Sequence, residues 1–121
     1  MSNRFCVSIT HCRADGDKAT VGFVVANAAI GSEKETIVFL STDGVWAAVR
    51  GEAEKINEGP PFAPLKELVE KFVAAGGRIL VCTPCLKKRG IDESQLINGA
   101  KAAGGAALVE FLSEGAPCVG Y

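Results

Sequence analysis

The chain has 121 residues, of which 48% are apolar, and this size and composition suit one domain built around a single hydrophobic core. A formal net charge of −1 leaves broad binding to nucleic acid or to an anionic membrane without its usual electrostatic cause. The longest apolar run, residues 21–30, is much shorter than the roughly 20 residues of a membrane-spanning helix, and residues 1–4 show no secretory cleavage signal. We therefore expect one cytoplasmic domain over residues 1–121, without direct contact to nucleic acid or membrane.

Five cysteines, an odd number, occur in a chain for which no export signal is expected. This number argues against a disulfide framework and for reduced thiols. Cys6 lies in the apolar segment 5–9 and is expected to be buried as a small hydrophobic side chain. Cys118 fits either a buried edge strand or an exposed thiol.

The first elements are predicted to be a strand and a helix that is apolar on all sides. Residues 5–10 are rich in β-forming side chains and lead into a polar turn that carries the only histidine, His11. A helix over residues 18–30 follows, with Asp15 or Asp17 as its N-cap. Because this helix has hardly any polar side chain, we expect the sheet and a second subunit to cover it, and we predict a homo-oligomer.

A second strand is predicted over residues 35–41 and ends at Thr42, Asp43 and Gly44. Its continuous apolar run suits a strand buried on both faces, as in a parallel sheet. Residues 45–50 fit a short helix. The irregular stretch 51–63 fits either a binding loop or a plain linker.

The clearest helix begins at Pro64 and ends at Gly76, and its apolar positions follow helical spacing. A third strand covers residues 78–82. Asp92 is predicted to cap a short helix that runs through residue 100, with a brief extended segment near Lys101. A helix over residues 106–113 and a strand over residues 117–121 complete the chain. This alternation predicts a three-layer α/β/α fold with a mostly parallel sheet of about five strands.

Reactive side chains follow three of the predicted strands. They are His11 and Cys12 after the first strand, Asp43 and Gly44 after the second, and Cys82 and Cys85 after the third. Ligands of open parallel sheets bind beyond the carboxyl ends of the strands. We therefore expect these residues to lie along one edge of the sheet.

Cys82 and Cys85 are the predicted chemical centre. Their spacing suits a strained disulfide, half of a metal site, or one reactive cysteine with a helper. Lys87, Lys88 and Arg89 follow directly, and a helix is expected to begin here, so both features favour thiolate over thiol. In the competing interpretation, Cys82 is buried in the core for packing and Cys85 is a surface thiol without a role. A run of basic residues taken alone is more often a solvent-exposed face than a ligand site.

Several segments together resemble the DsrE/DsrF-like family. They are the apolar first helix and residues 41–45, 81–91, 96–100 and 108–112. The resemblance implies a compact α/β fold, trimers or hexamers, and a cysteine that accepts a persulfide sulfur and passes it to a partner protein. Cys82 stands seven residues before Arg89 of an Arg-Gly pair, the position of the sulfur-carrying cysteine in the family, and Cys85 matches the second cysteine of a CxxC-bearing branch.

Three functions follow from these residues. The first is a sulfur carrier in which Cys82 holds a persulfide, Lys87, Lys88 and Arg89 stabilise the anion, and Cys85 releases the sulfur. In the second, a zinc-binding module, Cys82 and Cys85 are joined by Cys12 and His11 as metal ligands. The third is a thiol-disulfide redox protein that uses Cys82 and Cys85. A dinucleotide site is not expected, because no GxGxxG follows the first strand.

Overall fold

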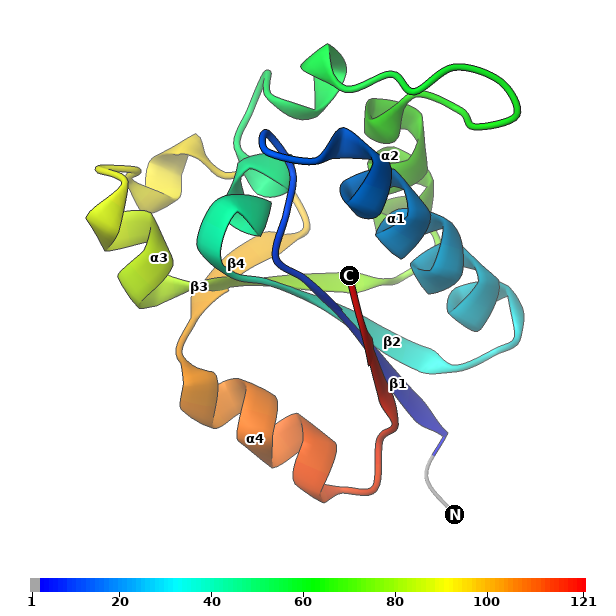
Figure 1. The fold of residues 1–121 in the computed structure, drawn as a ribbon. Coiled ribbons are helices and arrows are strands. Elements are labelled where there is room, and N and C mark those ends of the chain that lie inside the picture. The colour runs from blue at the N-terminus through cyan, green and yellow to red at the C-terminus, as the bar shows by residue number, and fades with distance from the viewer. Residues whose placement is uncertain (1–2) are drawn as a thin grey trace.

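The computed structural model describes residues 3–121, in which five strands alternate with helices (Figure 1). The strands are β1 Arg4–Ile9, β2 Glu35–Leu40, β3 Arg78–Cys82, β4 Ala100–Ala103 and β5 Cys118–Gly120. The helices are α1 Gly16–Gly31, α2 Leu65–Ala74, α3 Thr83–Lys88 and α4 Gly105–Ser113, with short 3-10 helices η1 Thr42–Ala48, η2 Ala53–Lys55 and η3 Glu93–Gln95. The sheet has the order β4-β3-β2-β1-β5 and each neighbouring pair in it is parallel. The predicted α/β fold is confirmed.

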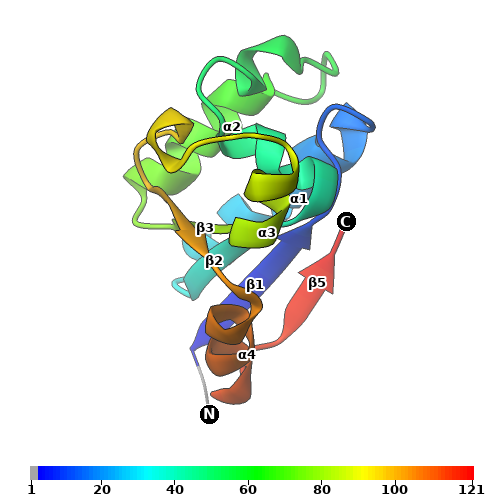
Figure 2. The ribbon, with the colours of Figure 1, turned by 90° about the vertical axis from the view of Figure 1, so that its left-hand side faces the viewer.

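The helices form layers on both faces of the sheet. Figure 1 shows α1 and α2 above the sheet and α4 below it. Helix α3 lies beyond the carboxyl end of β3, as Figure 2 shows from the side. Phe23 of α1 and Phe72 of α2 meet edge to face, with 5.9 Å between their ring centroids. This contact joins the two helices over the larger of two buried apolar clusters.

The continuous apolar pattern of β2 has the predicted cause. Val38 and Leu40 face the large cluster beneath α1 and α2, whereas Ile37 and Phe39 face a smaller cluster beneath α4. All four side chains are buried. A strand in the middle of a parallel sheet loses its solvent face on both sides, so alternation between apolar and polar residues disappears.

Helix α1 begins at the predicted cap, because the Asp15 side chain accepts a hydrogen bond from the backbone N–H of Lys18 at 3.1 Å. Its small residues allow close packing on β1: a Cβ atom added at Gly22 would lie 2.5 Å from a methyl group of Ile9. Val24 remains 37% exposed on the outer side. A second subunit over this surface stays a prediction.

The predicted helix after Asp92 is too long. Asp92 and Gln95 form the cap, but the helix ends after one 3-10 turn at Gln95. Leu96 then pairs with Val49 in an antiparallel bridge, and the N–H of Ile97 binds the carbonyl oxygen of Ala48. These tertiary bonds hold the segment extended, so the stretch predicted near Lys101 forms a full strand, β4. The irregular segment 51–63 contains η2, and the helix expected over residues 45–50 is instead η1, which begins at Thr42.

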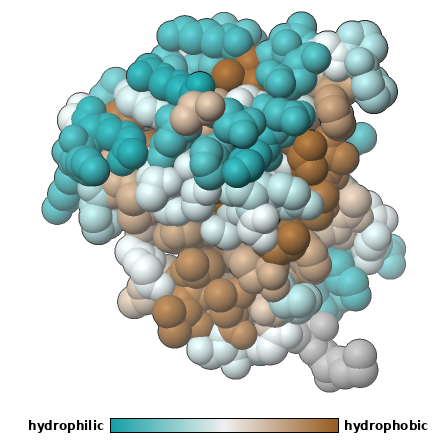
Figure 3. Space-filling view, in the orientation of Figure 1, coloured by the Kyte–Doolittle hydropathy of each residue, from teal (hydrophilic) through white to brown (hydrophobic). Residues whose placement is uncertain are grey.

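The surface is not uniform in polarity. Figure 3 shows hydrophilic side chains across the top of the molecule, over the loops, and apolar surface gathered over α4 below. Val109 of α4 is 63% exposed. Among residues 3–121, no helix combines the length and apolar character needed to cross a membrane.

Gly44 is the residue on which the close approach of η1 to β1 depends. A Cβ atom at this position would lie 2.2 Å from the carbonyl oxygen of Ile9. We expect Gly44→Ala to lower the free energy of unfolding in urea by about 2–3 kcal/mol, because the backbone of β1 must move. Gly31→Ala is the matched control: nothing lies within 4 Å of a Cβ there, and stability should rise slightly. Equal effects of the two substitutions would contradict this interpretation.

Candidate thiol site

The parallel sheet brings the ends of β1, β2 and β3 together at one edge, as the sequence predicts. Thr42, two residues after β2, connects them: its hydroxyl oxygen lies 2.8 Å from the carbonyl oxygen of Thr10, directly after β1. Its backbone N–H donates a hydrogen bond of 3.1 Å to the sulfur of Cys85 in α3. Residues from three separate segments are therefore held within one hydrogen-bonded group.

Cys82 and Cys85 form the centre of this group. Cys82 is the last residue of β3 and the N-cap of α3, and both side chains are half-buried. The side chain of Cys85 lies close enough to Cys82 to help raise the pKa of the Cys82 thiol. Cys82 packs on the apolar cluster beneath α4, whereas Cys85 packs on the cluster beneath α1 and α2. The pair therefore lies between the two apolar clusters at the end of β3.

Thr42 holds its position in an uncommon backbone conformation, with φ at 50°. For a β-branched residue this left-handed region costs on the order of 1 kcal/mol. The Thr42 hydroxyl offsets part of that cost, because it lies within hydrogen-bond distance of the carbonyl oxygens of Thr10 and Ser41. Local backbone strain of this kind is often found at functional sites. In Thr42 the strained conformation accompanies a backbone N–H that binds the Cys85 sulfur.

The electrostatics of Cys82 differ from the sequence-based expectation. Burial raises the pKa of Cys82, and the thiol and charge of Cys85 raise it further. The backbone amide of Cys85 and the guanidinium of Arg89 act in the opposite direction with smaller effect. The expected net preference for the Cys82 thiolate is therefore wrong: Arg89 favours the thiolate, but desolvation outweighs its effect.

The basic residues occupy different surroundings. Lys87 and Lys88 are exposed in the last turn of α3. Arg89 is half-buried and donates a hydrogen bond of 3.1 Å to the carbonyl oxygen of Cys85. Of the three, Arg89 is thus the one that contacts the thiol segment directly.

Cys12 and Asp43 have a structural role. Cys12 is fully buried, and burial raises the pKa of its thiol to about 12, with the charge of Asp43 adding to the shift. One carboxylate oxygen of Asp43 accepts the backbone N–H groups of Cys12 at 2.6 Å and Ala14 at 2.9 Å. Asp43 therefore shapes the turn between β1 and α1.

His11 is fixed by one ring nitrogen. Its Nδ1 lies 2.8 Å from the hydroxyl oxygen of Thr10, and that hydroxyl donates to the main-chain oxygen of Tyr121 at 3.0 Å. These contacts hold the imidazole ring of His11 beside the end of β1 and leave Nε2 outside this pair of bonds. Within residues 3–121, no three His, Cys, Asp or Glu side chains are grouped to hold a metal ion.

The turn after β1 is clamped by residues that sequence reasoning missed. The guanidinium of Arg13 lies 3.4 Å from the ring centroid of Trp46 and 2.8 Å from a carboxylate oxygen of Glu52. The Lys55 ammonium also binds Glu52, and these two cations, Lys55 first, keep the pKa of Glu52 below its usual range. An arginine following a strand gives no hint of this, because the aromatic partner is distant in sequence.

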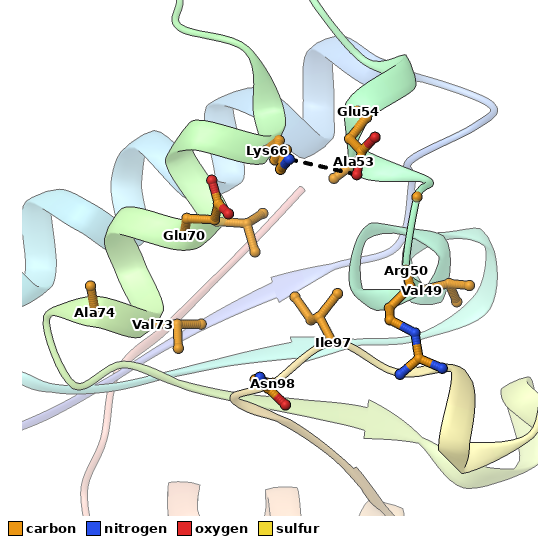
Figure 4. Close-up of a pocket in the computed structure, with 12 residues that line it drawn as sticks. Val49, Arg50, Ala53, Glu54, Lys66, Glu70, Val73, Ala74, Ile97 and Asn98 are labelled. Atoms are coloured by element: carbon orange, nitrogen blue, oxygen red, sulfur yellow. Dashed lines mark ion pairs between the residues drawn. The ribbon is translucent and has the colours of Figure 1, made fainter.

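A separate cavity of about 500 Å³ lies between α2, the segment after η1 and the loop before β4 (Figure 4). Its floor is apolar, with Val69, Val73 and Ile97, and an ion pair between Lys66 and Glu54 stands at its rim. None of the cysteines lines it. The size of this cavity therefore says nothing about the thiol chemistry.

Comparisons with known proteins show the family of this chain. The chain belongs to the DsrE/DsrF-like family, which it matches over residues 3–118. It is 32% identical to the uncharacterized protein MJ0989 of Methanocaldococcus jannaschii, with 92% of this chain and 93% of that protein covered. The family named from the sequence is thus confirmed.

A second relative is longer than this chain. The uncharacterized protein MJ0760 of the same organism is 31% identical over 100 residues, which cover 83% of this chain and 36% of that protein. The chain therefore spans about a third of the length of MJ0760. The uncharacterized protein MK0008 of Methanopyrus kandleri is 30% identical, with 81% of this chain and 77% of that protein covered.

Solved structures show the same fold. The crystal structure of the ychN protein from E. coli superposes with a TM-score of 0.82 at 18% identity, and each chain is covered completely. The protein MTH1491 of Methanobacterium thermoautotrophicum, described as of unknown function, gives a TM-score of 0.70 at 18% identity, with 98% of each chain covered. At these identities the likeness extends to the fold alone.

Two substitutions should shift the pKa of Cys82 in opposite directions. Cys85→Ala is expected to lower it, because the nearby Cys85 thiol and the charge on that sulfur both raise it. Arg89→Gln is expected to raise it, because the guanidinium lowers it. The measurement is the pH dependence of Cys82 alkylation by iodoacetamide, followed by peptide mass spectrometry. The alkylation profile of Cys118, on the edge strand β5, is the internal control. Shifts of the Cys82 pKa in the same direction in both variants would contradict the assignment.

Proposed function

We propose that this chain is a sulfur carrier in which Cys82 accepts a sulfane sulfur and Cys85 takes part in its release. The observation that carries the proposal is the placement of both cysteines where β3 passes into α3, with the Thr42 N–H bound to the Cys85 sulfur. Membership in the DsrE/DsrF-like family, which is associated with sulfur relay, supports it. Five free thiols suit a reducing compartment such as the cytoplasm.

Sulfur uptake begins when the Cys82 thiol loses its proton to solvent. The thiolate then attacks the outer sulfur of a donor persulfide, R–S–SH. A Cys82 S–S bond forms, the S–S bond of the donor breaks, and the donor leaves as the thiolate R–S⁻. Cys82 now carries the persulfide Cys–S–SH, and no external oxidant is needed because the sulfur moves between thiols.

The sulfur on Cys82 is released by one of two routes. In transfer, an acceptor thiolate attacks the outer sulfur, takes it as a persulfide and returns the Cys82 thiolate. In resolution, the Cys85 thiolate attacks the Cys82 sulfur, hydrosulfide leaves, and a Cys82–Cys85 disulfide forms that two further thiols must reduce. The N–H of Thr42 stabilises the negative charge that Cys85 carries before this attack.

The same placement supports a thiol-disulfide redox function as the second candidate. Two thiols near enough to influence each other's charge need little movement to form a disulfide. The two functions differ in what Cys82 carries after reaction, which is an added sulfur in one case and a bond to Cys85 in the other. For either function we propose a homo-oligomer, a trimer or hexamer as the family implies. In the carrier function, the sulfur donor and acceptor are transient partners.

A persulfide assay tests the carrier function. After incubation with glutathione persulfide, wild-type protein is expected to gain one sulfur on Cys82, located by peptide mass spectrometry. Cys82→Ser should gain none, whereas Cys85→Ser should retain the added sulfur longer because resolution is lost. Cys118→Ser is the control and should behave as wild type. A Cys82–Cys85 disulfide without any sulfur-bearing intermediate would instead favour the redox function.

Sulfur uptake should also depend on pH in a defined direction. Because the pKa of Cys82 is raised, the reactive thiolate is a small fraction at neutral pH and grows with pH. We expect the uptake rate to rise about tenfold between about pH 7 and about pH 8, as for any nucleophile well below its pKa. The uptake rate is measured by stopped-flow mixing with the persulfide donor over this pH range. A rate that is flat with pH would show that ionisation of Cys82 does not limit uptake.

A further inference from the structure

A second pair of cysteines lies on neighbouring strands, away from the proposed carrier site. Cys6 of β1 and Cys118 of β5 are register partners in the parallel sheet. Opposed residues of parallel strands point to the same face, and the Cys118 side chain lies close enough to Cys6 to help raise the pKa of that thiol. Neighbouring strands lie about 4.8 Å apart. This spacing falls within the Cα separation of about 4.4–6.8 Å that disulfides span.

The two thiols differ in their access to solvent. Cys118 is exposed, and its sulfur makes only a long contact of 3.8 Å with the carbonyl oxygen of Val119. Cys6 is fully buried in the cluster beneath α4. Burial and the neighbouring Cys118 raise the pKa of Cys6. A small reagent therefore reaches Cys118 first, and Cys6 can react only with a group already attached to its neighbour.

The pair is distinct from Cys82 and Cys85. Cys6 lies on β1 and Cys82 on β3, and β2 separates these strands. Side chains of β2 on the same face, Ile37 and Phe39, fill the space between them. Exchange between the two cysteine pairs would require the sheet to open.

The position of the pair gives it a structural consequence. β5 is an edge strand of three residues. It is held by backbone bonds such as Cys6 N–H to Pro117 O at 3.0 Å and Tyr121 N–H to Ser8 O at 2.8 Å. The main-chain oxygen of Tyr121 also accepts the N–H and the hydroxyl of Thr10. A covalent bond at Cys118 would thus fix the strand that supports Thr10, which in turn contacts Thr42.

We propose that Cys6 and Cys118 form a redox modification site, in which a low-molecular-weight disulfide oxidises the two thiols to a bridge between β1 and β5. The Cys118 thiolate attacks one sulfur of the reagent R–S–S–R, forms a mixed disulfide and releases R–S⁻. The Cys6 thiol then loses its proton, its sulfur attacks the Cys118 sulfur, and the second R–S⁻ leaves. Two protein thiols are oxidised, one reagent disulfide is reduced to two thiols, and the released protons go to these thiolates.

The order of the two steps predicts a pH dependence. Attack by Cys6 requires a thiol whose ionisation burial disfavours, so ring closure is the slow step. The mixed disulfide on Cys118 should accumulate near neutral pH and close faster as pH rises. The closed bridge should raise the midpoint of thermal unfolding, since it joins the edge strand to the sheet and closes a long loop.

Oxidised glutathione is the probe for this site. Native wild-type protein is incubated with it, free thiols are blocked at low pH, and the peptides are mapped by mass spectrometry. We expect first glutathione on Cys118 and then a peptide pair joined through Cys6 and Cys118. Cys12, which is equally buried but has no thiol partner in register, should remain free and serves as the internal control. Cys6→Ala should stop at the mixed disulfide, and Cys118→Ser should leave Cys6 unmodified.

A denatured sample gives the decisive comparison. In an unfolded chain the shorter loop between Cys6 and Cys12 closes more readily than the long loop between Cys6 and Cys118. Oxidation in urea should therefore favour the link between Cys6 and Cys12, whereas the native protein should give the link between Cys6 and Cys118. A Cys6–Cys12 link in native protein, or glutathione that stays on Cys118 at high pH with Cys6 intact, would overturn the proposal. The result of this test does not depend on whether Cys82 carries a sulfane sulfur, so it is separate from the test of the carrier function.

Discussion

The proposed chemistry depends on one hydrogen bond, from the backbone N–H of Thr42 to the sulfur of Cys85. It joins the end of β2 to helix α3, and the Thr42 hydroxyl extends the link to the end of β1. Without it the two cysteines would be an isolated pair on a short helix of six residues, which offers only a weak dipole. Gly44 makes the arrangement sterically feasible, because only a residue without Cβ lets η1 pass so close to the carbonyl oxygen of Ile9.

The large-scale features could be predicted from sequence because they depend on local patterns. The apolar run of β2, the Asp15 cap of α1 and the glycines that end α2 each report a local preference, and the structure confirms them. The helix predicted through residue 100 was wrong because contacts of Leu96 and Ile97 with residues distant in sequence outweigh helix propensity. The parallel sheet, though not its strand order, then followed from the alternation of elements.

The site was only partly predictable for a related reason. The sequence indicates that Cys82 and Cys85 stand at a strand end beside three cations, and the structure places them there. It carries no signal for Thr42, whose role lies in a backbone N–H that any residue type could supply. It also suggested the wrong direction for the pKa of Cys82, because counting nearby cations leaves out burial, which here is the larger effect. The pairing of Cys6 with Cys118 could not be predicted either, since residues far apart in sequence can be matched only once the strand order is known.

A raised pKa at Cys82 is consistent with storage of sulfur rather than rapid turnover. A thiolate of higher pKa is intrinsically more nucleophilic, so Cys82, once ionised, attacks a donor persulfide well. The same property makes it a poor leaving group, and an acceptor that attacks the outer sulfur must expel Cys82 as a thiolate. Uptake is thus favoured over release as long as the surroundings of Cys82 stay as they are. An acceptor protein that places a cation near Cys82 would lower that pKa and speed transfer, whereas Cys85 supplies a route that does not expel Cys82. Under the proposed function, two thiols of unequal environment would give the site a way to hold sulfur and separate ways to release it.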